Sequence, residues 1–352
     1  MSVGSGALLD IADTLARAAQ RDLTDPVAFE NIIADIGTNA QNALRNEIAL
    51  HGRRVESMFA YVAAALGKCT LVRQEDIGDI YIESHEDCLV PDYRLILKDG
   101  AGLLVEVKNR HSRSPSSTFS MRTRDLLRLE RYAQINGLPL LLAIYWSRWR
   151  LWTLVRPEDL TVKGLRRRIT FSEALVANRM VNLGDFYLGT TPPLRLVLEA
   201  DSMKPAFMSS EGQASLTIGN VRMWAGQTEV TSNAERSLLM YLWFYGDWSD
   251  AGPFALQQNE QLTAIEFYCE PDEFTDRQGF ELFPPMSSMI ARQFDQLTTE
   301  SGTIRTLAPV VQPNGLGQRA PGRVGEMTLP LWVFHAQPSG GDVKGDGTVD
   351  FG

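Results

Sequence analysis

The sequence predicts an α/β (α+β) fold, with a mixed sheet flanked by helices and a second α+β domain after it. Residues 6–66 carry apolar side chains at helical spacing. Residues 69–155 alternate short segments rich in β-branched and aromatic residues with one helical segment, which is typical of a sheet with a crossover. The chain has 352 residues, more than one hydrophobic core usually serves, so a second domain is expected.

The N-terminal residues are predicted to form three helices, over 6–18, 26–42 and 42–66. Thr24-Asp25-Pro26 provides a cap and a proline for the first turn of the second helix. Gly67 is expected to end the third, because glycine commonly follows a helix C-terminus.

Strands are predicted over residues 69–72, 77–82, 93–97, 103–108, 140–145 and 150–155. Lys98-Asp99-Gly100 is a hairpin signal between the third and fourth of these strands. Residues 109–120 are expected to form a polar, mobile loop that becomes ordered when a substrate binds. A helix should follow over 122–136, ended by Gly137 and Pro139. The apolar run 140–145 is typical of a strand buried on both faces.

The domain organisation is predicted as a helical segment (1–44), a first α/β domain (45–200), a C-terminal α+β domain (201–337) and a disordered tail (338–352). In the second half, helices are expected over 171–177 and 287–297, and strands over 194–198, 265–268 and 329–334. A hairpin is expected from 214–218 and 221–224. Ser232 and Glu235 form a capping-box pattern for a further helix, and Ser287-Ser288 is interpreted as a helix cap.

Composition narrows the functional class. No apolar run is long enough to span a membrane, and no secretory signal is recognised at Met1–Leu9. The three cysteines (Cys69, Cys88, Cys269) form no CxxC pair, and the four histidines are not spaced as metal ligands. These features indicate a cytoplasmic protein without a disulfide framework or a structural zinc site.

The charge distribution is uneven. The chain has a net charge of −9, yet residues 107–168 contain 14 Lys or Arg against 4 Asp or Glu. Residues 199–300 contain 16 acidic and 5 basic residues. A local basic segment inside an acidic protein indicates a phosphate-facing surface, since local positive charge dominates polyanion binding. The alternative is a solvated basic helix, or arginines paired with the acidic C-terminal part.

The pattern that indicates chemistry is Pro91-Asp92, thirteen intervening residues, then Glu106-Val107-Lys108. Glu106 and Lys108 share one face of a strand, about 6.6 Å apart along it. Asp92, at the start of the hairpin partner, can point at the same spot. Two carboxylates and the Val107 carbonyl offer the oxygen ligands that Mg²⁺ prefers. Such an ion neutralises charge on a phosphodiester and lowers the pKa of the attacking water, which Lys108 can hold or help deprotonate.

These residues resemble the PD-(D/E)xK, restriction-endonuclease-like nucleases, in their resolvase-like and Mrr-like branches, over residues 45–157. The resemblance implies that Asp92 and Glu106 bind Mg²⁺, with Mn²⁺ as a substitute, and that Lys108 activates water. The upstream Arg53-Arg54-Val55-Glu56 is similar to the family's helix, whose glutamate contacts the metal cluster directly or through water. Glu56 is otherwise a surface residue beside Arg53. Asn109 stands where some branches carry glutamine, and Asp79 is a rival carboxylate expected to face solvent.

DNA contacts are expected from arginines after the catalytic strand, because the guanidinium fork suits phosphates. The candidates are Arg110, Arg113, Arg122, Arg124, Arg128 and Arg131. The last three share a helix face at i, i+4, i+7 spacing.

The sequence therefore predicts a Mg²⁺-dependent DNA endonuclease, acting as a homodimer, with bacterial or phage restriction and defence as the setting by family analogy. The acidic C-terminal part is expected to dimerise or to bind a protein partner. The alternatives are a structure-specific (Holliday-junction-type) resolvase or repair nuclease, and a non-catalytic DNA-binding or assembly subunit. RNA is not excluded as a substrate.

Overall fold

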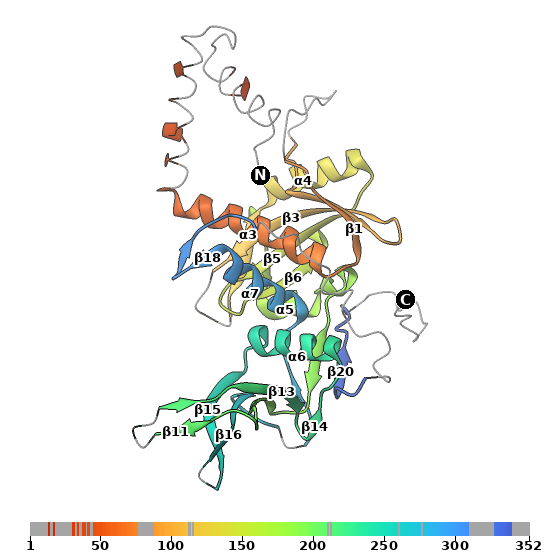
Figure 1. Cartoon of the computed structure of the whole chain (residues 1–352). Coiled ribbons are helices and arrows are strands. Elements are labelled where there is room, and N and C mark those ends of the chain that lie inside the picture. The colour runs from red at the N-terminus through yellow and green to blue at the C-terminus, as the bar shows by residue number, and fades with distance from the viewer. Residues whose placement is uncertain are drawn as a thin grey trace. The chain divides into compact units, whose positions relative to one another are not determined.

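The computed structural model describes residues 13, 14, 17, 30, 31, 34, 37–39, 41, 42, 45–76, 88–111, 114, 116–209, 211, 213–259, 261–275, 277–309 and 327–339 (Figure 1). By its internal contacts the chain divides into two units, residues 1–55 and residues 56–352. In the first unit every described residue except Asn46 is helical. Both bounds of the helix predicted over 6–18, and the start of the helix predicted over 26–42, lie outside the described residues, whereas Asn42 is described and is helical.

Helix α3 (Glu47–Ala65) starts later than the predicted residue 42. Asn46 interrupts the helical conformation, and its side-chain oxygen accepts a hydrogen bond from the Ala49 N–H at 3.2 Å. An asparagine in this position is a favourable N-cap, which explains the corrected start. The predicted end is confirmed, since Gly67 adopts a left-handed conformation with φ of +81°.

A five-stranded mixed sheet forms the centre of the first half of the chain. Its order is β1–β2–β3–β5–β6, with β1 (Cys69–Gln74), β2 (Tyr93–Leu97), β3 (Gly102–Arg110), β5 (Leu140–Trp146) and β6 (Leu151–Val155). Strands β3 and β5 are parallel and are joined by helix α4 (Thr123–Asn136), while the other pairs are antiparallel. Gly100, with φ of +87°, allows the predicted turn between β2 and β3. The protein is thus mixed α+β, as the sequence predicts.

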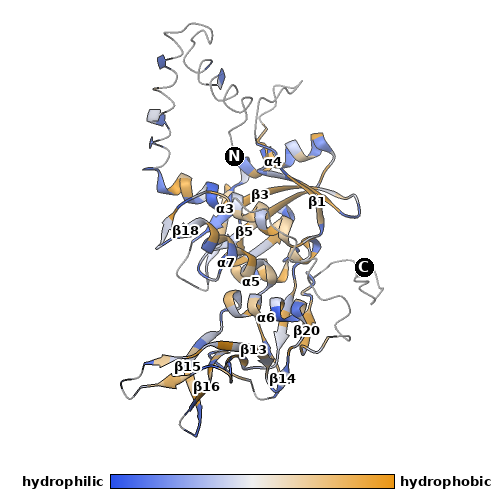
Figure 2. Ribbon diagram, viewed as in Figure 1, coloured by the Kyte–Doolittle hydropathy of each residue, from blue (hydrophilic) through white to orange (hydrophobic). Residues whose placement is uncertain are grey.

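Both faces of this sheet are covered. One face packs against α4 in a core that includes Leu104, Leu126, Leu129, Leu142 and Ile144. On the other face the ring of Phe59 in α3 lies 6.0 Å from Tyr93 and 5.5 Å from Trp152. Every residue of β5 is buried, which confirms the prediction for 140–145. Figure 2 shows β3 and β5 in the colours of apolar residues.

A second sheet occupies part of the segment predicted to be a mobile loop. Its strands are β4 (Thr118–Arg122), β8 (Arg166–Thr170) and β7 (Thr161–Lys163), in the order β4–β8–β7. The loop predicted over 109–120 is therefore wrong at both ends, since β3 continues to Arg110. Phe119 and Met121 of β4 are buried together with Ile169 of β8 in the α4 core, and this burial stabilises the strand.

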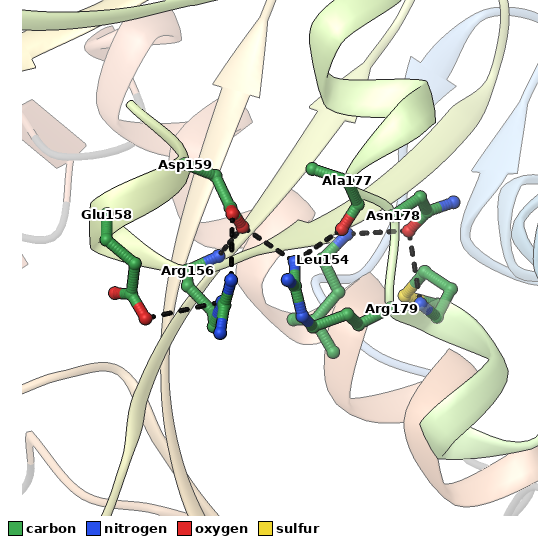
Figure 3. Close-up of polar contacts among 8 residues, drawn as sticks. Leu154, Arg156, Glu158, Asp159, Ala177, Asn178 and Arg179 are labelled. Carbon is green, nitrogen blue, oxygen red and sulfur yellow. Dashed lines mark hydrogen bonds and ion pairs between the residues drawn. The ribbon is translucent and has the colours of Figure 1, made fainter. Parts of the chain in front are cut away.

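The chain after β6 is held by a buried ion pair (Figure 3). Arg179 is 8 % exposed and donates hydrogen bonds of 2.6 Å to Asp159 Oδ2 and to the Ala177 carbonyl. Asn178 Oδ1 accepts the Leu154 N–H at 2.9 Å. These contacts tie β6 to the short elements that follow it, η1 (Pro157–Asp159), α5 (Phe171–Val176) and η2 (Met180–Leu183).

The described residues after η2 form antiparallel sheets and the helices α6 (Asn233–Tyr245) and α7 (Met286–Thr298). A five-stranded sheet has the order β14–β13–β10–β16–β15, with β10 (Leu194–Ala200), β13 (Ile218–Ala225), β14 (Thr228–Glu229), β15 (Ser249–Gln258) and β16 (Gln261–Glu270). The smaller sheets are β17–β9–β20, β11–β12 and β18–β19, formed by β9 (Tyr187–Thr190), β11 (Phe207–Met208), β12 (Ala214–Ser215), β17 (Glu281–Leu282), β18 (Thr299–Glu300), β19 (Thr303–Ile304) and β20 (Leu331–Phe334). The predicted domain boundary near residue 200 would fall at the end of β10, and that division stays a prediction.

Strand β15 lies at one edge of the five-stranded sheet. All ten of its residues are exposed, and its pairing with β16 shifts register between Ala251 and Phe254. Pro253 lies inside this irregular stretch. Among the described residues, no strand pairs with the outer side of β15.

The predicted hairpin and the predicted capping box of this half are wrong. Residues 214–218 and 221–224 do not form a hairpin, because β12 pairs with β11 and β13 pairs with β10 and β14. The side chain of Ser232 makes no capping hydrogen bond to α6. Glu235 is instead buried and accepts hydrogen bonds from Thr328 Oγ1 at 2.5 Å and the Leu329 N–H at 3.0 Å. These long-range donors satisfy a buried carboxylate, and local sequence spacing does not reveal them.

Two of the three cysteines are poorly suited to nucleophilic catalysis. Cys69, Cys88 and Cys269 are free thiols. Burial raises the pKa of Cys69 to about 11 and that of Cys269 to about 12, so neither is a thiolate at neutral pH. Among the helices in the described part of the chain, none is long and apolar enough to cross a membrane.

Asp185 fixes the start of α7. Its carboxylate accepts the Ser287 N–H at 2.8 Å, the Ser287 hydroxyl at 2.6 Å and the Phe186 N–H at 3.1 Å. Ser287 is therefore not the helix cap that the sequence suggested, since Pro285 occupies that position and makes no side-chain cap hydrogen bond. Burial raises the pKa of Asp185 to about 6, against the lowering effect of these hydrogen bonds.

Replacing Asp185 with Ala should lower the free energy of unfolding by about 1–3 kcal/mol, because Ser287 would lose its buried acceptors. Asp185→Asn keeps one carbonyl acceptor and should lower it less. The pKa of Asp185 is higher in the folded than in the unfolded protein, so its favourable contribution is complete below pH about 4 and is lost as the pH rises through about 6. Urea unfolding across this range should show Asp185→Asn gaining stability relative to the wild type as the pH rises. A constant difference would contradict this account.

Candidate active site

The antiparallel pairing of β2 with β3 brings Asp92 next to Glu106. Tyr93 lies opposite Val105, so the residue before Tyr93 neighbours the residue after Val105, on the same face of the sheet. Asp92 Oδ2 accepts a hydrogen bond from the Val107 N–H at 2.6 Å. Asp92 and Glu106 are each 9 % exposed. The aspartate is thus fixed by the backbone of the strand that carries the glutamate.

Lys108 lies two residues after Glu106 in β3, and its side chain reaches the same group of acids. Its Nζ lies 2.5 Å from Glu106 Oε1, in an ion pair that is also a hydrogen bond. The alternation of side chains along a strand places Leu104, Glu106 and Lys108 on one face, and Leu104 packs in the α4 core. The structure therefore brings Asp92, Glu106 and Lys108 together on the α4 face, as the sequence pattern requires.

Burial is the largest influence on the charges of the two acids. Burial, followed by the charge of Glu106, raises the pKa of Asp92 to about 7, although Lys108 opposes this. The pKa of Glu106 is also raised, mainly by burial. Burial would lower the pKa of Lys108, but Glu106 and Asp92 outweigh it, so the pKa rises and the ammonium group stays charged. Two buried carboxylates that resist ionisation form a site that an added cation would stabilise.

The donor set fits a hard divalent cation. Carboxylate and carbonyl oxygens are the ligands that Mg²⁺ accepts. The N–H and C=O of one strand residue point to the same edge of the strand. Because the Val107 N–H points to Asp92, the Val107 carbonyl lies on that same edge. Asp92, Glu106 and the Val107 carbonyl are thus the groups here that could hold such an ion.

Glu56 acts on this group as a neighbouring charge. It lies half-buried in α3, and its charge raises the pKa of Asp92 and of Glu106. Within the described residues, no group of three or more His, Cys, Asp or Glu side chains lies close enough together to hold a metal ion. Contact of Glu56 with a metal therefore stays a prediction. The rival carboxylate, Asp79, lies outside the described residues.

The predicted DNA-binding arginines fall into two places. Arg110 is the last residue of β3 and donates from Nε to Ser117 Oγ at 3.2 Å. Arg113 lies outside the described residues. The remaining residues are at the start of α4 or within it: Arg122, Arg124, Arg128 and Arg131.

The arginines of α4 connect to the segment that carries Asp92. Arg128 Nη2 lies 3.4 Å from the Cys88 carbonyl, and the carbonyl of Arg128 accepts the Leu89 N–H at 3.2 Å. Arg166 also belongs to this basic surface but was not predicted, although Arg166-Arg167-Arg168 forms a basic run in the sequence. Its side chain donates to Ser120 Oγ at 3.0 Å and to the Ser120 carbonyl at 2.9 Å, which sets it beside the start of α4.

A groove lies between the start of α4 and the β7–β8 turn, with a volume of about 840 Å³. Its lining combines four arginines with two leucines and a threonine: Arg122, Thr123, Arg124, Leu127, Arg128, Leu165 and Arg166. No acidic side chain of the described residues lines it. The groove is therefore positively charged with an apolar part.

No protein-family model matches the chain, and no curated protein matches it. Among solved structures, the chain is similar to Hjc of Archaeoglobus fulgidus, described as a Holliday junction resolvase from an archaeal hyperthermophile. The sequences are 20% identical, and the match covers 27% of this chain and 77% of that chain, with a TM-score of 0.22. A TM-score of this size does not establish a common fold.

Mg²⁺ should stabilise the wild-type protein against thermal unfolding, and Asp92→Asn should remove that effect. A ligand at about one hundred times its Kd adds about 2.7 kcal/mol to the free energy of unfolding. Protons compete with the metal for Asp92, whose pKa is about 7, so the stabilisation should shrink as the pH falls below this value. Glu158→Gln, at an exposed glutamate, is the matched control. Equal stabilisation of wild type and Asp92→Asn would show that the ion binds elsewhere.

Proposed function

We propose that this chain is a divalent-metal-dependent endonuclease that hydrolyses DNA phosphodiester bonds. The observation that carries the proposal is the pair of buried acids, Asp92 and Glu106, with the half-buried Lys108 on the same sheet face and the Val107 N–H bonded to Asp92. This arrangement fits the PD-(D/E)xK pattern that the sequence resembles. A cluster of two buried acids and a half-buried amine with raised pKa values is also typical of a catalytic site.

Asp92, Glu106 and the Val107 carbonyl would hold Mg²⁺, with Mn²⁺ as a substitute. When bound, the ion would neutralise charge on the phosphate and lower the pKa of the attacking water. Glu56 adds negative charge to the site and would contact the metal directly or through water. The Val107 N–H keeps Asp92 oriented, because one carboxylate oxygen is already fixed by the backbone.

Lys108 acts in this proposal as a charged hydrogen-bond donor. Its pKa is raised while it is paired with Glu106, so in this state the group is an ammonium ion and cannot accept a proton. An ammonium ion can orient the water and counter the negative charge on the phosphate. Any role of Lys108 as a base would need Glu106 to be neutralised first, since the carboxylate keeps the proton on the amine.

The arginines of α4 and β8 would bind the phosphate backbone of the substrate. They stand on a locally basic segment of an otherwise acidic chain, which favours polyanion binding at this place. RNA also carries a phosphate backbone and could bind to the same arginines.

Two copies of the site would serve to cut both strands of a duplex, and the acidic C-terminal half is proposed to provide the contact between copies or with another protein. Restriction and defence, and junction resolution or repair, are alternative settings for this activity.

A non-catalytic DNA-binding or assembly subunit is the second candidate. The observation that favours it is the ion pair of Lys108 with Glu106, which occupies a potential metal ligand. A cation of higher charge than an ammonium would have to displace this lysine from the carboxylate. Cleavage and binding assays separate the two candidates.

Lys108→Ala should reduce the rate of Mg²⁺-dependent DNA cleavage by about a hundredfold or more, the usual effect of removing one group that stabilises transition-state charge. Asp92→Ala should act similarly, and both variants should still bind DNA. The measurement is cleavage of plasmid, linear and branched DNA with Mg²⁺, Mn²⁺ or EDTA. Lys98→Ala is the matched control, since Lys98 lies exposed in the β2–β3 turn. Wild-type binding without cleavage in either metal would favour the non-catalytic subunit.

Arg124→Ala should weaken DNA binding by a similar factor for different sequences, and reduce the slope of log affinity against log salt by about 1. The reason is the loss of one phosphate contact and of the counterion released there. Binding titrations in EDTA at several salt concentrations measure the slope. Arg305→Ala, which removes an exposed arginine paired with Glu300, serves as the control. An unchanged slope would place the phosphate contacts on another surface.

A further inference from the structure

The turn between β7 and β8 presents an exposed leucine in a fixed position. Leu165 is 88 % exposed. It follows Gly164, which adopts a left-handed conformation with φ of +60°, and it is flanked by the paired residues Lys163 and Arg166. Its carbonyl accepts the Thr123 N–H at 2.9 Å, so the turn is attached to the start of α4. An anchored apolar tip between two cations suits a partner that is both apolar and anionic.

The groove beside this tip offers the same combination. Leu127 is 52 % exposed and lies with Leu165 among four arginines, in a groove that no acidic side chain lines within the described part of the chain. Duplex DNA presents phosphates outward but hides the faces of its bases in the stack. An unpaired strand presents both, and single-strand grooves combine positive charge with platforms on which bases stack, usually aromatic side chains. In this groove Leu127 and Leu165 offer the apolar contact instead. The lining therefore favours an unpaired strand over a closed duplex.

The groove lies on the same face and at the same end of the sheet as the carboxylates. Pro139, which follows the C-terminus of α4, accepts a hydrogen bond from the Leu104 N–H near the start of β3. Helix α4 joins two parallel strands and runs back along the sheet, so its first turn lies near the carboxyl end of β3. Lys108 lies toward that end of β3, on the face that α4 covers. The bond between Leu89 and the Arg128 carbonyl also connects the groove to the segment that carries Asp92.

We propose that Leu165 is a strand-separating wedge. It inserts at the base step where a duplex meets an unpaired strand, and the unpaired nucleotides enter the arginine-lined groove between α4 and the β7–β8 turn. Apolar side chains placed between base steps are known to unstack them and bend the duplex. The inference rests on the proposed function, because it takes DNA as the ligand, and it names branched or forked DNA as the substrate class.

The test is binding in EDTA of two labelled DNAs, a blunt duplex and the same duplex with one unpaired arm. The forked DNA carries 2-aminopurine at the junction, where unstacking increases fluorescence. Wild type should bind the fork more tightly and increase the fluorescence. Leu165→Ala should lose the increase and bind the fork about tenfold less tightly, as expected when one base contact is lost, with unchanged affinity for the blunt duplex.

Two further variants sharpen the result. Leu165→Met keeps a long apolar side chain and should restore the signal, while Leu297→Ala, at a leucine 44 % exposed on α7, should behave as wild type. Equal affinity of wild type and Leu165→Ala for the fork, or an unchanged fluorescence increase, would overturn the wedge. Parallel cleavage assays with Mg²⁺ report on the proposed function separately, since the wedge can hold in a protein that does not cleave. Failure of the wild type to bind either DNA would overturn both.

Discussion

The register between β2 and β3 is the constraint on which the candidate site depends. Regular pairing stops at Tyr93 opposite Val105, and the side chain of Asp92 then takes the Val107 N–H that a further strand residue would have bonded. Asp92 thus extends the β2–β3 pairing through its side chain and is at the same time one of the acids of the site. A slip of one residue would turn Glu106 and Lys108 toward the α3 face and place valines where the charges now lie. The buried alternation of β3 opposes such a slip, because Leu104 would leave the α4 core.

The same hairpin also places ionisable groups where burial makes their charged forms unfavourable. Two carboxylates and one ammonium group are held where burial disfavours charge, and the ion pair of Lys108 with Glu106 offsets only part of this. Burial therefore still raises the pKa of both acids, that of Asp92 to about 7. The basic residues on α4 and β8 lie outside this cluster, so the chain separates a negative interior site from a positive surface. That separation suits a ligand whose backbone is anionic throughout and whose reacting group needs a cation.

Sequence patterns predicted the central sheet well, because its strands and helix follow simple periods. The strands at 93–97 and 140–146 and the helix at 123–136 match the predicted segments closely, and the spacing from Asp92 to Lys108 was sufficient to bring those side chains together. Strand β4 was missed because Phe119 and Met121 alternate with polar residues in a segment dominated by serine and arginine. Its partner β8 is distant in sequence, so the groove and Leu165 could not be assigned. Glu235 shows the opposite failure, in which a correct local pattern is overridden by buried long-range partners.

Strand β15 has a consequence for how the protein behaves at high concentration. An exposed strand at a sheet edge is a template for further strands from other molecules, and β15 carries one charged side chain, Asp250, and no lysine. Its protection comes from Pro253, which has no N–H to offer, and from the register shift between Ala251 and Phe254. Pairing at this edge is therefore opposed by a short irregular stretch more than by charges on β15 itself, although residues 199–300 as a whole carry 16 acidic against 5 basic side chains. Phe254–Gln258, beyond that stretch, is the segment from which aggregation would begin if Pro253 were lost.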